Sequence, residues 1–183
     1  MESVEELRVT LGGVHPLAAT KVKDHLEPHV RAFITKAPFA IMATSNAAGD
    51  CDATPRGGKP GFIKVIDDRT LLMPDIGGNR LFQSHENFES NPKAGFLFMI
   101  PGINVTARVN GRVRRISADE VRKLVLQPEL HWADANSLLI QGLLVDIDQA
   151  YFHCPRSFQF ADLWNTQTQQ DNASRSLKDV LSS

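Results

Sequence analysis

Short apolar runs, separated by clusters of Gly, Pro, Asn and Asp, dominate the middle of the chain. Such runs are typical of strands, because they are too short for helices and turn-forming residues stand at both ends. The pattern predicts strands in FAIMATSN, CDATP, GFIKVI, TLLMP, AGFLFMIPG, NVTARVNGRVRRI and SLLIQGLLVDI. The sixth of these alternates regularly, which predicts one apolar face made by Val105, Ala107, Val109, Gly111 and Val113. Asn110-Gly111 predicts a bulge or bend in that strand.

Apolar residues at helical spacing mark the remaining segments. We expect helices over residues 4–10, 18–36, 79–90, 117–126 and 149–160. Pro28 predicts a kink or a restart in the second helix, because proline cannot donate the helical hydrogen bond. Asn79 is a candidate N-cap of the third helix, and the SADE sequence at residues 117–120 is a capping box that opens the fourth.

The order of these elements indicates the fold class. Most strands are joined by short connections, and the helices stand at the ends of the chain or in crossovers. This arrangement favours a mainly β fold, an antiparallel β-barrel with peripheral helices, over a doubly wound sheet. We interpret residues 1–183 as one domain, with an N-terminal helical segment at 1–36, the barrel and its crossover helices at 38–164, and a polar C-terminal tail at 165–183.

Charge and composition exclude several classes of protein. A net charge of -1 with neutral histidines produces no field that attracts nucleic acid or an anionic membrane. No apolar run approaches the ~20 residues of a membrane-spanning helix, and the acidic N-terminal sequence MESVEELRVTLGG is not a signal peptide. Cys51 and Cys154 do not make a disulfide framework. We therefore expect a cytoplasmic protein that binds neither nucleic acid nor a membrane.

Two glycine-containing loops carry the candidate chemistry. The first, DATPRGGKPGFIKV, places Arg56 beside Gly57, Gly58 and Gly61, whose backbone can approach a ligand closely. The second, PDIGGNRLFQS, places Arg80 at the expected start of a helix, where free N–H groups favour a phosphate. Either loop alone is compatible with a solvent-exposed turn. Because both follow strands of one small barrel, they can converge on a single anion.

Other polar residues carry weaker signals. Arg108, Arg112 and Arg114 lie on the polar face of one strand. For Arg112 and Arg114 we expect solvent exposure or pairing with acidic residues on neighbouring strands. The histidines, including His85, show no metal-ligand spacing, and we expect them on the surface or in helix packing. The sequence contains no GxSxG, HExxH or GxxxxGK[ST] motif, so hydrolase, zinc-protease and P-loop functions have no support.

Three motifs, PRGGKPGF, DDRTLLMPDIGGNR and RVNGR, resemble in their order and spacing those of the FMN-binding split-barrel proteins of the pyridoxamine 5′-phosphate oxidase-like family. Within that family the chain is most similar to the FMN-dependent PPOX-class subgroup. The resemblance runs from about Lys21 to Trp164. It implies a six-stranded antiparallel split β-barrel that forms a homodimer, with FMN in grooves between the subunits.

The resemblance also implies which residues bind the cofactor. The segment from Lys59 to Lys64 would run along the flavin, and Asn79 with Arg80 matches a phosphate-binding pair. The full set of implied positions is Thr54, Arg56, Lys59, Phe62, Ile63, Lys64, Pro74, Asp75, Asn79, Arg80 and Thr106. Neither a catalytic residue nor a metal ligand is identified.

Several departures from the family pattern bear on function. Gly58 and Val105 stand where the subgroup has acidic residues, and 160–162 (Phe-Ala-Asp) replaces cationic residues near the end of the barrel. The basic C-terminal motif of the true oxidases is absent, so we do not expect pyridoxamine 5′-phosphate as the substrate. The resemblance implies an FMN-dependent oxidoreductase that acts on an unidentified small molecule, with NAD(P)H or oxygen as its redox partner. The alternative is a non-catalytic protein, such as a redox sensor, that binds flavin, haem or a deazaflavin.

Overall fold

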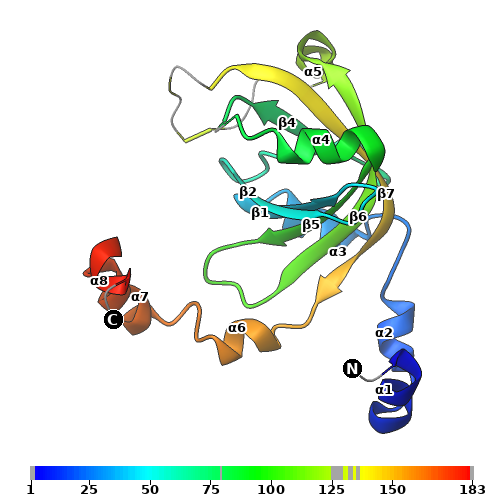
Figure 1. Cartoon of the computed structure of the whole chain (residues 1–183), viewed down its shortest axis with the longest axis vertical. Helices are drawn as coiled ribbons and strands as arrows, with labels where there is room; N and C mark the ends of the chain where they lie inside the picture. The colour runs from blue at the N-terminus through cyan, green and yellow to red at the C-terminus, as the bar shows by residue number, and fades with distance from the viewer. Residues whose placement is uncertain (1–2, 79, 125–129, 132–133, 135–136, 182–183) are drawn as a thin grey trace.

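A strongly curved antiparallel sheet forms the centre of the computed structural model, which describes residues 3–78, 80–124, 130, 131, 134 and 137–181. The seven strands lie in the order β2-β1-β5-β6-β7-β4-β3. Their bounds are β1 Phe39–Ser45, β2 Cys51–Gly57, β3 Lys64–Val65, β4 Thr70–Ile76, β5 Lys93–Met99, β6 Thr106–Ser117 and β7 Leu139–His153. The curvature brings β2 at one edge towards β4 near the other (Figure 1), and an ion pair between Arg56 and Asp75 joins these two strands.

The predicted class, a mainly β split barrel with peripheral helices, is confirmed, but the sheet has one strand more than the six implied. The additional strand is the short β3, in which only Lys64 and Val65 pair with β4. Phe62 and Ile63, expected in the same strand, instead bury their side chains in the core. Gly61 permits this turn, because it has φ 77° and its α-carbon approaches the Thr35 carbonyl so closely that a Cβ would lie 2.9 Å from that oxygen.

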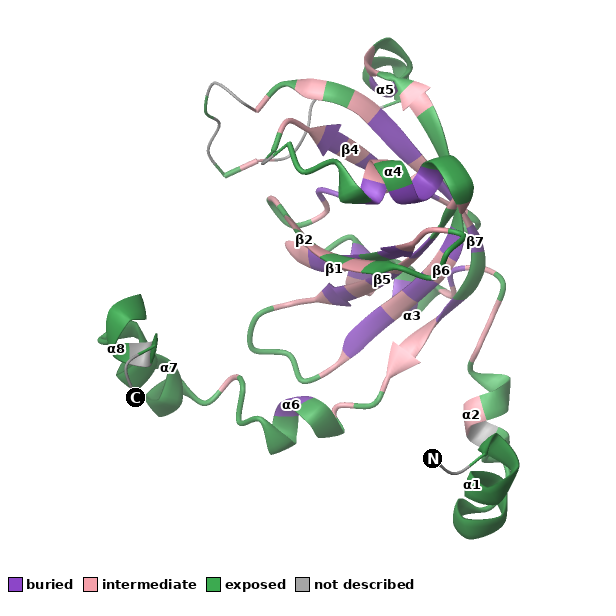
Figure 2. Cartoon of the chain, in the orientation of Figure 1, coloured by how far each residue is buried: buried purple, intermediate pink, exposed green. Residues whose placement is uncertain are grey.

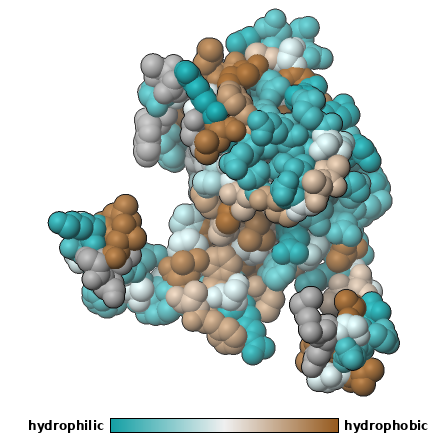
Figure 3. Space-filling model, viewed as in Figure 1, coloured by the Kyte–Doolittle hydropathy of each residue, from teal (hydrophilic) through white to brown (hydrophobic). Residues whose placement is uncertain are grey.

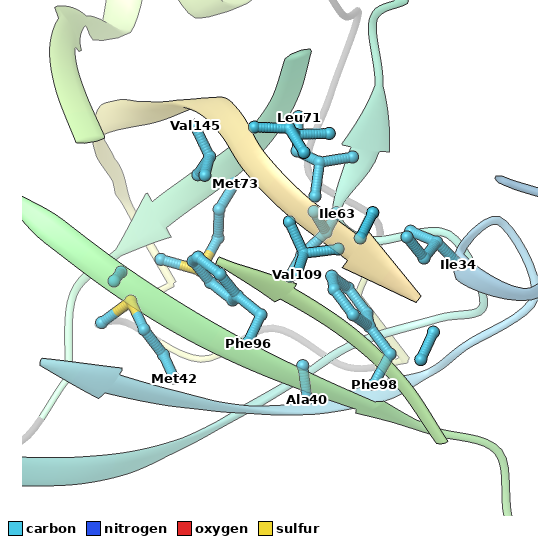
Figure 4. Close-up of a cluster of buried hydrophobic side chains, with 14 of the residues drawn as sticks. Ile34, Ala40, Met42, Ile63, Leu71, Met73, Phe96, Phe98, Val109 and Val145 are labelled. Carbon is cyan, nitrogen blue, oxygen red and sulfur yellow. The ribbon is translucent and has the colours of Figure 1, made fainter. Parts of the chain in front are cut away.

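Alternation along the strands builds the core, as the sequence pattern predicted. In β6, Ala107, Val109 and Val113 turn inward and are buried. Phe96 and Phe98 of β5 stack with ring centroids 6.0 Å apart, and Met42 of β1 lies beside them (Figure 4). Each fully buried large apolar side chain contributes roughly 1.5–3 kcal/mol relative to exposure, so this cluster holds the curved sheet in shape.

The two longest strands, β6 and β7, form the spine of the sheet. Their register shifts between Asn110 and Gly111, which confirms the predicted bulge. The predicted helix over 149–160 is wrong for its first part, because β7 continues to His153 by pairing with the start of β6. Arg114 of β6 makes two hydrogen bonds to the Asp146 carboxylate of β7, at 2.6 and 2.8 Å, so its expected pairing with an acidic neighbour is confirmed.

The helices lie at the ends and edges of the sheet. Their bounds are α1 Val4–Leu11, α2 Pro16–Thr20, α3 Pro28–Ile34, α4 Gln83–Ser90, α5 Ala118–Leu124, α6 Arg156–Phe160, α7 Thr166–Ala173 and α8 Leu177–Leu181. Pro28 restarts the helix at the first position of α3, as predicted, and α3 buries Val30 and Ile34 against the sheet. Ser117 and Glu120 form the predicted capping box of α5; its expected extension to residue 126 falls outside the described residues.

The terminal helices extend away from the sheet (Figure 1). Neither α1 nor α7 buries a residue, and both are exposed along their length (Figure 2). The segment expected as a polar C-terminal tail contains the helices α7 and α8. Asn165 caps α7 by accepting hydrogen bonds from the N–H groups of Gln167 and Thr168. Within the described residues, no helix has the length and apolar character required to cross a membrane.

Candidate functional site

A cavity of about 490 Å³ opens between the end of β2, the segment after β4, the first turn of α4 and the start of β7. This volume lies within the range of roughly 300–1,000 Å³ that is usual for small-molecule sites. The polar and charged side chains in its wall include Thr54, Arg56, Asp75, Arg80, Ser84 and His85. Its apolar side chains are Leu81, Phe82, Leu138 and Ile140 together with Pro55 and Ile76.

Arg56 enters the cavity from β2 and is only loosely held by the protein. Its side chain is 21% exposed, and its Nη1 lies 3.7 Å from Oδ1 of Asp75, which is an ion pair but too long for a hydrogen bond. The buried Nε has no hydrogen-bond partner among the described residues. Burial lowers the pKa of the Arg56 guanidinium, and the nearby Asp75 carboxylate opposes that shift only in part. This cation therefore retains donors for a ligand.

Asp75 of β4 is the most buried charged group of the site, with its side chain 2% exposed. Its Oδ2 accepts a hydrogen bond from Nε2 of His85 at 2.7 Å and another from Nε2 of Gln141 at 3.0 Å. The pairing of β4 with β7 places Asp75 opposite Gln141, which explains the second contact. The carboxylate is thus satisfied by His85 and Gln141, while Arg56 faces it at a greater distance.

The segment between β4 and α4 has an unusual backbone. Arg80 and Phe82 have φ values of 62° and 57°, in the left-handed region that residues other than glycine rarely adopt. Such positions cost roughly 1–3 kcal/mol each and cluster at functional sites. The helix begins at Gln83, and its N-cap Phe82 offers no side-chain acceptor, so in the described part of the chain no N-cap side chain satisfies the first-turn N–H groups. Ser84 in this turn lies 3.3 Å from the Thr54 hydroxyl, which joins α4 to β2.

The structure brings the two sequence-predicted loops together. Thr54 and Arg56 come from the first loop and Asp75 and Arg80 from the second, and all four line the same cavity. The prediction that the two loops come together is therefore confirmed. That they bind an anion stays a prediction. The expected N-cap, Asn79, lies outside the described residues, and α4 starts later than predicted because Arg80 and Phe82 adopt non-helical conformations.

The other implied cofactor residues do not line this cavity. Phe62 and Ile63 are core residues, and Thr106 is 2% exposed on β6. Lys59 is exposed in the loop after β2, whereas Lys64 on β3 and Pro74 on β4 are partly buried. A contact between these six residues and a flavin stays a prediction.

Sequence reasoning missed His85 and Gln141. His85 fits the helical spacing of α4, and Gln141 lies in an apolar strand, so neither had a chemical signal of its own. Their shared partner, Asp75, is 10 residues from His85 and 66 from Gln141. One signal was available in the sequence. Asp75 stands near the end of a predicted strand and His85 near the start of a predicted helix, and a short connection can bring two such residues together.

The curved antiparallel sheet with peripheral helices places the chain in the class of split β-barrels. A family model described as pyridoxamine 5′-phosphate oxidase matches residues 26–141, and the chain belongs to this family. A search of curated proteins finds no match.

Solved structures share the fold at low sequence identity. A candidate pyridoxamine 5′-phosphate oxidase from Lactobacillus delbrueckii is 14% identical, with a TM-score of 0.53, over 70% of this chain and 95% of that one. An FMN-binding protein from Syntrophomonas wolfei is 12% identical, with a TM-score of 0.51, over 82% and 97%. A histidine-to-alanine variant of HupZ from group A Streptococcus is 17% identical, with a TM-score of 0.50, over 69% and 98%.

Proposed function

We propose that this protein is an FMN-dependent oxidoreductase that acts on a small molecule bound in the cavity. The observation that carries the proposal is the convergence of Arg56, Arg80 and the uncapped N-terminus of α4 on one cavity wall. The shared fold of a structure described as an FMN-binding protein also supports it. A bound flavin supplies hydride or electron transfer, and the protein supplies binding and orientation.

The phosphate of FMN suits the polar end of this cavity. Arg56 offers a guanidinium with an unpartnered Nε, and Arg80 adds an exposed positive charge. The N-terminus of α4 contributes N–H groups and the positive end of the helix dipole. A charge-assisted hydrogen bond from Arg56 contributes about 1.5–3 kcal/mol and the exposed Arg80 contributes up to about 1 kcal/mol, so the group as a whole can supply much of the affinity for a phosphorylated ligand.

The apolar side chains suit a flat ring and a covering partner. Leu81, Phe82, Leu138 and Ile140 are between 53% and 68% exposed although they line the cavity. Exposed apolar residues gathered around a cavity are typical of a ligand-binding or protein-binding surface. We assign the inner part of this surface to the isoalloxazine ring.

We propose a homodimer in which the partner subunit covers the outer part of the cavity. The exposed apolar residues at the rim support this, as do Leu177 and Leu181 on the C-terminal helix α8, which are 74% and 77% exposed. Figure 3 shows apolar surface on this extended C-terminal segment. Size-exclusion chromatography with light scattering tests the proposal: we expect twice the chain mass of 20.2 kDa. A monomer at micromolar concentration contradicts it, and the Ile140→Asp variant is expected to shift a dimer towards monomer.

Two measurements test the function. The absorption spectrum of purified protein is expected to show flavin bands, whereas a Soret band would indicate haem. Anaerobic mixing of the FMN-loaded protein with NADH or NADPH is expected to bleach the flavin, and a coupled electron acceptor is expected to restore the colour. Tight flavin binding with neither reduction nor reoxidation supports the alternative, a flavin-binding protein without turnover, and contradicts the enzyme.

A further inference from the structure

An aspartate–histidine pair, Asp75 and His85, stands in the cavity wall. Neither side chain is among the groups proposed above to bind the phosphate. The Asp75 carboxylate accepts a hydrogen bond from Nε2 of His85 at 2.7 Å. The two side chains differ sharply in exposure, because Asp75 is 2% exposed and His85 is 29% exposed. Both residues line the cavity, and the imidazole is the more accessible of the two groups.

The geometry fixes the tautomer of the neutral imidazole. An ionised carboxylate can only accept hydrogen bonds, so Nε2 of His85 must carry the proton that it donates to Asp75. The remaining ring nitrogen, Nδ1, then has a free lone pair. No described residue makes a hydrogen bond to Nδ1. A histidine whose one nitrogen is held by a buried carboxylate has the arrangement that catalytic histidines use to accept and return a proton.

Neighbouring groups hold this pair in place. Gln141 donates a second hydrogen bond to the same Asp75 oxygen at 3.0 Å, so the carboxylate cannot easily turn away from His85. The rings of Phe82 and His85 lie edge to face with centroids 6.0 Å apart. Among the described lining residues, the charged groups besides Asp75 are Arg56 and Arg80, both positive and both assigned above to the phosphate.

We infer that His85 is the acid–base residue of the cavity, that it exchanges a proton with the substrate through Nδ1, and that Asp75 is its positioning residue. This inference rests on the proposed function for its redox partner. A substrate that would give a hydride to a bound flavin must also lose a proton, and Nδ1 of His85 would accept that proton. In the reverse direction Nδ1 would return it. The Asp75 carboxylate stabilises the imidazolium that forms.

A second His–Asp pair in the same molecule provides a matched control. His25 contacts Asp24 through Nδ1 at 2.9 Å, but both side chains are on the surface, 37% and 65% exposed. The two pairs share their chemistry and differ in burial, in the nitrogen used and in the presence of a cavity. A merely structural role for Asp75–His85 predicts that the two imidazoles behave alike.

The experiment uses the flavin-free full-length protein with ¹⁵N-labelled histidine. Nitrogen chemical shifts at alkaline pH report the tautomer, and mass spectrometry reports the rate at which diethyl pyrocarbonate acylates each imidazole. We expect His85 to be the Nε2–H tautomer and to be acylated at Nδ1. Asp75→Asn is expected to shift the tautomer and slow this acylation by about tenfold or more, because an amide can donate where the carboxylate accepts. Asp24→Asn is expected to leave His85 unchanged.

Several results would overturn the inference: an Nδ1–H tautomer in the unmodified protein, acylation of His85 no faster than that of His25, or no effect of Asp75→Asn on either readout. FMN provides the test of location. Where FMN binds, it must protect His85 and not His25 from acylation, and binding without protection contradicts the inference. Where FMN does not bind at all, the proposed function fails, while the tautomer and acylation results still decide whether the pair is built for proton transfer.

Discussion

Replacing Arg56 with methionine removes the guanidinium and keeps an apolar stem of similar length in the wall of the cavity. The side chain is only 21% exposed, its Nε has no partner in the part of the chain that the structure describes, and its contact with Asp75 is 3.7 Å long. Its donors are therefore available to a ligand. The prediction is that Arg56→Met weakens FMN binding much more than it weakens the fold.

The structure sets the size of both effects. Loss of one charge-assisted contact of about 1.5–3 kcal/mol raises the Kd for FMN by about 10- to 150-fold. Removing one partner of a buried ion pair can cost about 3–5 kcal/mol when the other charge is left uncompensated. Asp75 keeps the hydrogen bonds from His85 and Gln141. We therefore expect the free energy of unfolding to fall by only about 1–2 kcal/mol.

Arg114→Met is the matched control, because this arginine also lies on a strand but is not among the residues that line the cavity. Its guanidinium pairs with Asp146 at 2.6 Å and both side chains are about half exposed. We expect an unchanged Kd for FMN and a loss of stability of at most about 1 kcal/mol. Fluorescence titration gives Kd, and urea unfolding gives the free energy. Equal FMN affinity in Arg56→Met and the unmodified protein would refute this account of the site.

Three other changes test separate parts of the structure. Arg80→Ala is expected to raise the Kd for FMN by about fivefold or less in the same titration, because an exposed charge contributes up to about 1 kcal/mol; a larger effect than that of Arg56→Met would reverse their assigned ranks. Gly111→Ala is expected to lower the free energy of unfolding by about 1–3 kcal/mol, because the new Cβ would lie 2.3 Å from the Asp146 carbonyl oxygen. Gly13→Ala is the control: its new Cβ would meet no described residue beyond its chain neighbours within 4 Å, so urea unfolding is expected to be unchanged. Hydrogen bonding to His25, with help from Arg69, lowers the pKa of Asp24 from 3.8 to about 2. Because the folded-state pKa is depressed, the resulting stabilisation is present above about pH 4 and is lost as the pH falls towards 2. The difference in urea midpoint between the unmodified protein and Asp24→Asn must shrink across that interval, and a constant difference contradicts the assignment.

The fold was predictable wherever local pattern and tertiary context agree. The strand at 39–45, the inward face of β6, the bulge at Asn110 and the capping box at Ser117 all follow from spacing and turn chemistry that act over a few residues. The extension of β7 to His153 was not predictable in this way. Its pairing with the start of β6 decides the conformation there, and that contact joins residues far apart in the sequence.

The candidate site was predictable only in its charges. The loops containing Arg56 and Arg80 signal an anion site by composition, and the curvature of the sheet brings them together. Asp75, His85 and Gln141 acquire their chemistry from a hydrogen-bond network across two strands and a helix. The sequence indicates only the Asp75–His85 part of it, through a carboxylate at a strand end followed by a histidine near a helix start. The late start of α4 depends on left-handed conformations at Arg80 and Phe82, residues whose type disfavours that region.

A comparison of FMN with riboflavin, titrated into the same flavin-free protein, addresses the binding claim most directly, since the two ligands differ only in the phosphate. Two cationic side chains and a helix N-terminus at the cavity wall predict that FMN binds tighter by about 100-fold or more. Equal affinities, or uptake of neither ligand, would contradict the claim that these groups hold a flavin by its phosphate.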